Sequence, residues 1–149
     1  MGWTFHIHLI AAISWIGGSV FMFILGVSLR DKDDQKAVYP RVGPIFGYFE
    51  IVSLLILVST GIFMIVENGL INILFDNSID SHVIESLRKK LILVSIIILV
   101  TITHTYIAFK TNNRERTHLE HLISRASSMA IFIINLFVMH YAIVIRSIL

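Results

Sequence analysis

The sequence has no cysteine, only two prolines and few charged residues. Asp, Glu, Lys and Arg make up 15% of its 149 residues, against about a quarter in soluble domains. Without cysteine the chain forms no disulfide and no thiolate-ligated zinc or iron–sulfur site. The hydrophobic fraction of 56% excludes a disordered chain, and the net charge of +2 gives no indication of a nucleic-acid partner. We therefore expect a single integral membrane domain over residues 1–149, surrounded by a lipid bilayer.

Four stretches of the chain are nearly uncharged and long enough to cross a bilayer. Residues 1–29, 91–109 and 126–145 contain no Asp, Glu, Lys or Arg, and Glu50 is the one such residue in 42–66. A helix needs about 20 residues to cross the hydrocarbon layer, and runs this apolar satisfy their backbone as helices. The sequence predicts an all-α membrane protein, a four-helix transmembrane bundle. Its spans are expected at about residues 3–29, 42–66, 90–110 and 126–147.

The connecting segments predict the orientation in the membrane. Residues 30–41 and 110–125 are expected to be polar loops, and the apolar run 70–75 is too short to cross, so we expect it at the membrane interface. The face with the first and third loops has eight Lys and Arg residues and the other face has four. The first face is therefore predicted to be cytoplasmic, with both termini outside. The membrane is expected to be the cytoplasmic membrane of a bacterium or archaeon.

Polar side chains inside the spans are the candidates for function, because burying them in hydrocarbon is costly. His8 shares one helix face with small residues and Trp15, which favours a contact between helices. Glu50 and His104 are predicted to differ in depth by roughly 5 Å and could pair. Two roles are open for that pair, a structural hydrogen bond or a proton relay or quinone site. Asn135 and His140 lie on different faces of the last span.

Two histidines are predicted to reach the same depth. His8 lies about seven residues from the outer end of the first span and His140 about eight residues from the outer end of the last. His104 lies nearer the opposite face, more than about 10 Å from that level. Two axial ligands of one haem must lie on opposite sides of a single iron. We therefore predict a haem b site with His8 and His140 as iron ligands and Trp15 beside it.

Several short motifs resemble those of a family of small polytopic membrane proteins. This superfamily contains the CopD-type copper-resistance proteins and the HemJ-type protoporphyrinogen oxidases. The resemblance lies in three of the four spans, in the segment 8–15 followed by Gly17-Gly18, in Thr60-Gly61, in Lys90-Leu91 and in His104-x-Tyr106.

The resemblance implies two kinds of function. Similarity to HemJ-type proteins implies a compact helical membrane protein that binds haem b, with His8 central and Lys90 important; as an enzyme it would be a membrane oxidoreductase. Similarity to the CopD type implies copper handling. The chain has Phe-Met-Phe-Ile-Leu at 21–25 where HemJ-type proteins have a Pro-Arg step, and its interval from Lys90 to His104 is longer. These differences argue against protoporphyrinogen oxidation itself.

Three functions remain open from the sequence. The first is a b-type haem protein that transfers electrons in the membrane and is linked to quinone, with Glu50, Lys90 and His104 as candidate catalytic residues. The second is a copper transporter or copper-binding protein, although the rings of His6 and His8 point apart on a helix. Its ligands would be His6, His8, Met139 and His140. The third is a non-catalytic small subunit of a larger respiratory or membrane complex, or a homo-oligomer.

Overall fold

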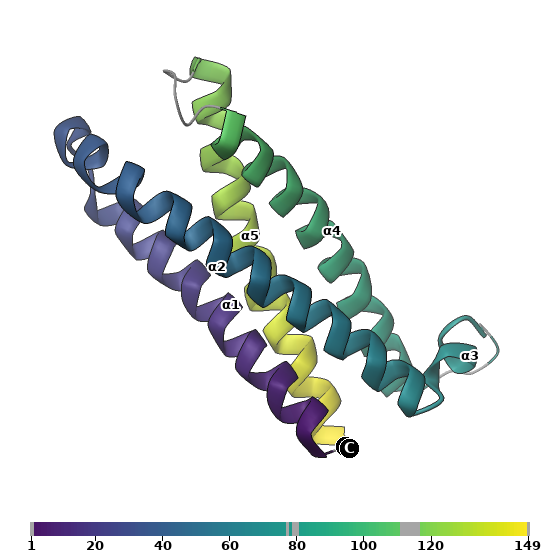
Figure 1. Ribbon diagram of the computed structural model, residues 1–149. Coiled ribbons are helices and arrows are strands. Elements are labelled where there is room, and N and C mark those ends of the chain that lie inside the picture. Colours follow the sequence, from purple (N-terminus) through teal and green to yellow (C-terminus); the bar gives the residue numbers. More distant parts are fainter. Residues whose placement is uncertain (1, 77, 79–80, 111–116, 149) are drawn as a thin grey trace. The chain divides into compact units, whose positions relative to one another are not determined.

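The computed structural model describes residues 2–76, 78, 81–110 and 117–148, and within this part the chain is helical (Figure 1). The helices are α1 (Gly2–Ser28), α2 (Lys32–Glu67), α3 (Leu70–Leu74), α4 (His82–Lys110) and α5 (His118–Ile148). Four of them are long and apolar enough to cross a membrane, namely Gly2–Ser28, Lys32–Glu67, His82–Lys110 and His118–Arg146. The predicted all-α class with four spanning helices is confirmed, and the chain is an integral membrane protein.

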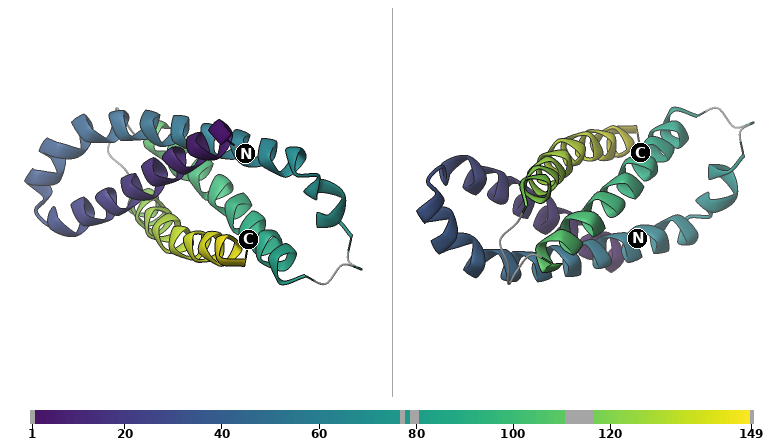
Figure 2. Two further views of the ribbon diagram at one scale, coloured as in Figure 1. Left: turned by 90° about the horizontal axis from the view of Figure 1, so that it is seen from below. Right: turned by 90° about the horizontal axis from the view of Figure 1, so that it is seen from above.

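The helices form two compact units, Met1–Gly69 and Leu70–Leu149. In the first, α1 and α2 run antiparallel and pack against each other; we call it the first hairpin (Figures 1 and 2). In the second, α4 and α5 do the same and α3 contacts α4; we call it the second hairpin. The expectation of a single domain stays a prediction.

Helix α2 begins about ten residues before the predicted span. The N–H of Asp33 donates to Oδ1 of the N-cap Asp31 at 3.2 Å, and Asp33 and Asp34 place negative charge in the first turn. Both features stabilise a helix N-terminus. Pro40 and Pro44 lie inside the helix without ending it. The prediction of a polar loop over 30–41 is therefore wrong from Lys32 onwards, because a capped helix extends beyond the apolar run.

Helix α5 also begins before its apolar run. The N–H of Thr117 donates to Oε1 of Glu120 at 3.3 Å, and the N–H of Glu120 donates to Oγ1 of Thr117 at 3.3 Å. This reciprocal pair is a capping box, whose T-x-x-E pattern is visible in the sequence. The predicted loop over 110–125 is therefore wrong from His118 onwards. His118 and His82 are the exposed first residues of α5 and α4.

Arg88 of α4 holds the segment that contains α3. Its Nε donates to the carbonyl of Leu74 at 2.8 Å and its Nη2 to that of Asp76 at 2.7 Å. These bonds satisfy carbonyls at the end of α3 that have no helical partner. Ser78 donates to Oδ1 of Asp76 from its hydroxyl at 2.6 Å and from its backbone at 2.9 Å, which lowers the pKa of Asp76. The interfacial position of this segment stays a prediction.

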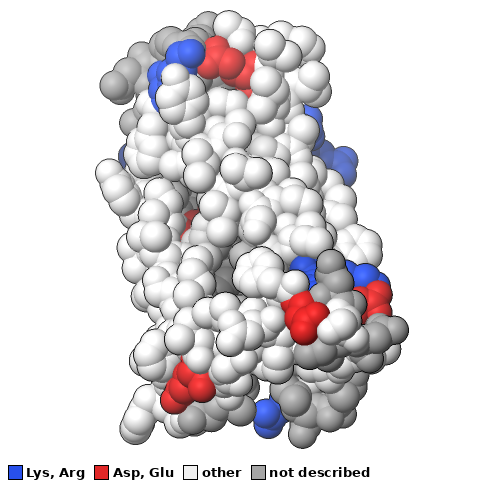
Figure 3. All heavy atoms as spheres, turned by 90° about the vertical axis from the view of Figure 1, so that its right-hand side faces the viewer, with Lys and Arg blue, Asp and Glu red and all other residues white. Residues whose placement is uncertain are grey.

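The two hairpins have polar side chains inside and apolar side chains outside. Trp15 is the largest fully buried side chain. Large hydrophobic residues on every long helix are exposed, and the charged residues in Figure 3 gather mostly toward the helix ends. Interior hydroxyls and amides with an apolar exterior are typical of helices that pack within a bilayer. The buried polar residues are Ser19, Ser53, Ser86, Thr101, Ser124, Ser127 and Asn135.

Candidate functional site: two imidazoles bonded to helix hydroxyls

His8 reaches from α1 to a hydroxyl on α2. Its Nδ1 lies 2.8 Å from Oγ1 of Thr60, and the ring is half-buried. The Thr60 hydroxyl donates to the carbonyl of Ile56, one turn earlier on its own helix, at 2.6 Å. The three groups form a short chain of hydrogen bonds that links the two helices.

This chain sets the tautomer of His8. A hydroxyl has a single hydrogen, and that of Thr60 points to the Ile56 carbonyl. Oγ1 of Thr60 therefore accepts, and Nδ1 of His8 is the donor. In the neutral imidazole the lone pair is then on Nε2. Histidines that ligate metals almost always donate their other ring N–H in this way, which fixes the ring and raises the basicity of the ligating nitrogen.

Gly61 lets the imidazole lie close to α2. A Cβ at position 61 would lie 3.3 Å from Cε1 of His8, tighter than ordinary van der Waals contact. Thr60 therefore binds the ring and Gly61 makes space for it. The resemblance motifs that contain His8 and Thr60-Gly61 thus meet at one contact between the first two long helices.

Trp15 and Glu50 lie further along the first hairpin. Trp15 is seven residues after His8, on the same face of α1, and is 2% exposed. Glu50 is ten residues before Thr60 in α2, which places it about 15 Å from the His8 contact along the helix. It is half-buried, and among the described residues no hydrogen bond or ion pair involves its carboxyl group. His8 and Glu50 are therefore not parts of one contact.

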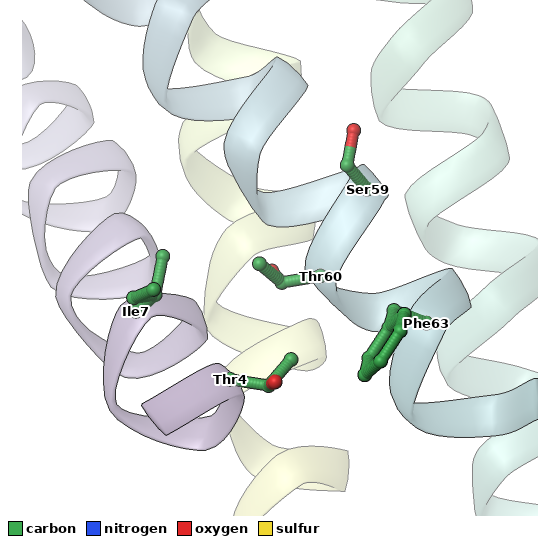
Figure 4. Close-up of a pocket in the computed structure, with 5 residues that line it drawn as sticks. All are labelled: Thr4, Ile7, Ser59, Thr60 and Phe63. Carbon is green, nitrogen blue, oxygen red and sulfur yellow. The ribbon is translucent and has the colours of Figure 1, made fainter. Parts of the chain in front are cut away.

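A shallow pocket lies beside Thr60, between the start of α1 and the end of α2 (Figure 4). In Figure 4, Thr4 and Thr60 extend from the two helices toward the space between them. The lining combines hydroxyl groups with large apolar side chains, a mixture suited to a lipid-soluble ligand with a polar end. The lining residues are Thr4, Ile7, Ser59, Thr60 and Phe63.

The second hairpin contains a comparable arrangement around His104. Nδ1 of His104 in α4 lies 2.8 Å from Oγ of Ser127 in α5, and this hydroxyl donates to the carbonyl of Ser124 at 2.9 Å. By the same argument, His104 donates from Nδ1 and has its lone pair on Nε2. Ser127 was not among the residues singled out in the sequence.

His140 is placed differently. Its ring is exposed on α5 and meets Tyr141 edge-on, with ring centroids 5.5 Å apart. Among the described residues no hydrogen bond reaches its ring nitrogens. Because His104 faces Ser127, the antiparallel register places Lys90 near the level of Tyr141 and His140. Lys90 and His140, two of the candidate residues, therefore lie at about the same position along the length of the second hairpin.

The candidate copper ligands are spread over both hairpins. Nδ1 of the exposed His6 lies 2.8 Å from the Gly2 carbonyl, which can only accept, so Nδ1 is the donor and the neutral ring has its lone pair on Nε2. His6 and His8 therefore have different hydrogen-bond partners. Met139 is 40% exposed. No group of three or more His, Cys, Asp or Glu side chains poised around a metal ion occurs in the described part of the chain.

Two predicted pairs join residues of different hairpins. His8 and Glu50 lie in the first hairpin, whereas His140 and His104 lie in the second. The pairs His8–His140 and Glu50–His104 therefore stay predictions.

The chain matches no family model, no curated protein and no solved structure.

Proposed function

We propose that this protein is a b-type haem protein of the membrane that transfers electrons, with His8 as an axial ligand of the iron. The observation that supports this is the hydrogen-bond chain from Nδ1 of His8 through Thr60 to the Ile56 carbonyl. It gives Nε2 the lone pair that iron requires. Haem brings four nitrogen ligands of its own, so that one or two oriented imidazoles are enough to hold it.

The residues around His8 suit such a group. The imidazole is fixed in its tautomer by Thr60 and approaches α2 closely at Gly61. Trp15 contributes to the apolar surroundings of the same hairpin, and burial of the site tunes a reduction potential. When bound, haem supplies one-electron chemistry, and the protein supplies ligation and surroundings.

His140, which the sequence assigns to the same depth as His8, would be the residue of the second hairpin that helps to hold the iron. Lys90 lies at the level of His140 in the second hairpin and offers a cation to the anionic propionates of haem. This gives Lys90, which the family resemblance singles out, a binding role.

The electron partner in this proposal is a lipid-soluble quinone. The pocket beside Thr60 supports this, because the hydroxyl of Thr4 can donate to a quinone carbonyl and Phe63 offers an aromatic face. Oxidation of a quinol releases two protons and two electrons, and a b-type haem would take the electrons one at a time and pass each to an electron acceptor before taking the next. Glu50 and His104 are the groups within the spans that we assign to taking up these protons.

The test is an absorption spectrum of the purified protein before and after reduction. We expect a Soret band and a pyridine haemochrome of haem b in the unsubstituted protein, a large loss of bound haem in His8→Ala and a smaller loss in His140→Ala. His118→Ala is the matched control, because His118 is an exposed histidine at the start of α5. A protein without a Soret band, or a His8→Ala variant with full haem content, would contradict the proposal.

Copper binding is the second candidate, and the His6 contact favours it. The hydrogen bond to the Gly2 carbonyl orients the imidazole of His6 for a metal as well. Copper titration followed by metal analysis separates the two functions. If the protein handles copper, His6→Ala and Met139→Leu should lower its copper content. If it is a haem protein, both variants should keep the haem spectrum of the unsubstituted protein.

A further inference from the structure

The segment around α3 carries exposed apolar side chains. Phe75 is 84% exposed, the largest exposed fraction among the large hydrophobic residues that the structure describes, and Ile71 is 42% exposed. No residue of α3 itself is buried. Exposed apolar side chains grouped in one place mark a contact with a membrane or with another protein. We call residues 70–76 the α3 segment.

Arg88 holds the α3 segment against α4 with three hydrogen bonds. Its Nε donates to the carbonyl of Leu74 at 2.8 Å, and its Nη2 donates to the carbonyls of Asp76 at 2.7 Å and Ile73 at 3.4 Å. α3 lies beside α4 in the second hairpin (Figure 1). A single turn of helix is unstable on its own, and α3 buries no side chain that would fix it. The position of the α3 segment is therefore set by Arg88.

Arg88 also relates the α3 segment to the depth of the membrane. It lies three residues before Leu91, where the charge-free run of α4 begins, which is about 4.5 Å along the helix axis. Helical side chains extend toward the N-terminus of their helix, so the carbonyls that Arg88 binds lie just outside the apolar run. The headgroup layer is roughly 5–8 Å thick on each side of the hydrocarbon. This count puts the α3 segment at the depth of the lipid headgroups.

The backbone and the charges of the α3 segment suit that depth. A one-turn helix leaves several carbonyls without helical partners, and such carbonyls are costly next to hydrocarbon. The guanidinium group of Arg88 satisfies three of them. Asp76 directly follows Phe75, and two hydrogen bonds from Ser78 lower the pKa of its carboxyl group and keep it charged. An apolar edge beside a charged, hydrogen-bonded end is the combination that lies in a membrane interface.

We propose that the α3 segment is a lipid anchor: Ile71 and Phe75 insert at the boundary between headgroups and acyl chains, and Arg88 holds them there. The anchor fixes the depth of α4 in the bilayer. Apolar insertion drives the contact, because the charges of Asp76 and Arg88 are of opposite sign and leave no net attraction for an anionic surface. The inference does not depend on the haem assignment.

The first experiment measures the depth of position 75 by spin labelling. The chain has no cysteine, so Phe75→Cys gives a single nitroxide site in vesicles of dioleoylphosphatidylcholine. Collisions with oxygen, which dissolves in lipid, and with a water-soluble nickel chelate are compared with two reference sites. Lys32→Cys, at the exposed polar start of α2, reports water, and Leu55→Cys, 62% exposed in the middle of α2, reports hydrocarbon. We expect an oxygen-to-nickel ratio at position 75 several times that at position 32. A ratio equal to that at position 32, or a label that neither reagent reaches because protein covers it, would overturn the proposal.

The second experiment removes the hydrogen bonds that hold the segment. In Arg88→Gln carrying the label at position 75, the oxygen-to-nickel ratio should fall toward that at position 32. The matched control is Lys89→Gln, because Lys89 forms an ion pair with the exposed Glu85 at 2.8 Å and should leave the ratio unchanged. An unchanged ratio in Arg88→Gln would refute the role of Arg88. Addition of phosphatidylglycerol should also change nothing, and a label that reaches lipid only when this anionic lipid is present would contradict apolar insertion. The first experiment leaves Arg88 in place, so it tests the anchor even if Arg88→Gln fails to fold.

Discussion

Both hairpins bury serine residues, but only the first contains glycine. All eight glycines of the chain lie in residues 1–69, and the second hairpin has none. In the first hairpin, aromatic rings lie near glycine, as Phe49 does near Gly18. In the second, the buried small residues are hydroxyl-bearing, among them Ser86, Ser124 and Ser127. In both hairpins, small side chains let the two helices come close together. Close packing matters in a bilayer, because the hydrophobic effect does not drive helices together there.

The same comparison shows one feature that the hairpins share. Each contains an imidazole that donates from Nδ1 to a hydroxyl on the neighbouring helix, and each hydroxyl donates to a carbonyl of its own helix. The hydroxyl is Thr60 in one hairpin and Ser127 in the other. The residue types differ and the hydrogen-bond order is the same. The two hairpins therefore hold an imidazole by the same order of hydrogen bonds on different packing surfaces.

The largest expected effect concerns the aromatic core of the first hairpin. Trp15→Ala should lower the free energy of unfolding by about 3–5 kcal/mol, because it empties a large buried volume. Ile97, also 2% exposed, is the buried counterpart in the second hairpin, and Ile97→Val should cost about 0.5–1.5 kcal/mol. Circular dichroism during unfolding by dodecyl sulfate in mixed micelles measures both. Equal losses would show that the first hairpin does not depend on its tryptophan.

A smaller effect is expected from the hydroxyl that orients His8. Thr60→Val keeps the branched shape and leaves the Nδ1–H of His8 without its acceptor. Hydrogen bonds between membrane helices contribute about 0.6 kcal/mol on average and up to about 1.7 kcal/mol. We expect a loss in that range from the same unfolding measurement, and Thr60→Ser should restore most of it. If valine is tolerated without loss and serine changes nothing, the contact does not contribute to helix pairing.

The four spans could be predicted because charge is absent over long runs, whereas the helix ends could not. Asp31 caps α2, and the Thr117–Glu120 pair caps α5. These residues continue the helices into polar sequence, and a count of apolar residues does not register them. The capping box at Thr117 was visible as a pattern, so attention to caps would have found this boundary.

The site could be predicted only in part. His8 and Thr60-Gly61 were singled out separately, but their contact depends on the register between α1 and α2. The sequence does not set that register, because most positions in both helices are interchangeable aliphatic residues. Ser127 gave no signal, since a serine in an apolar helix can face lipid, a neighbouring helix or its own backbone. The donor and acceptor roles followed only from the hydroxyl contacts with Ile56 and Ser124.

The smallest expected effect tests whether the first hairpin needs glycine at the imidazole. In Gly61→Ala, the new Cβ would lie 3.3 Å from Cε1 of His8, so the ring must move by a few tenths of an ångström. Alanine also favours the helix by roughly 0.5–1 kcal/mol, which offsets part of that strain. The matched control is Gly47→Ala in the same helix, where a Cβ meets nothing within 4 Å and the helix gain should appear in full. The difference in unfolding free energy between the two variants isolates the contact with His8, and the ¹³C shift of Cε1 should change in Gly61→Ala alone. Equal stabilisation by both substitutions, with an unchanged His8 resonance, would mean that the ring does not lie against α2. The first hairpin would then not hold an imidazole against its second helix as the second hairpin does.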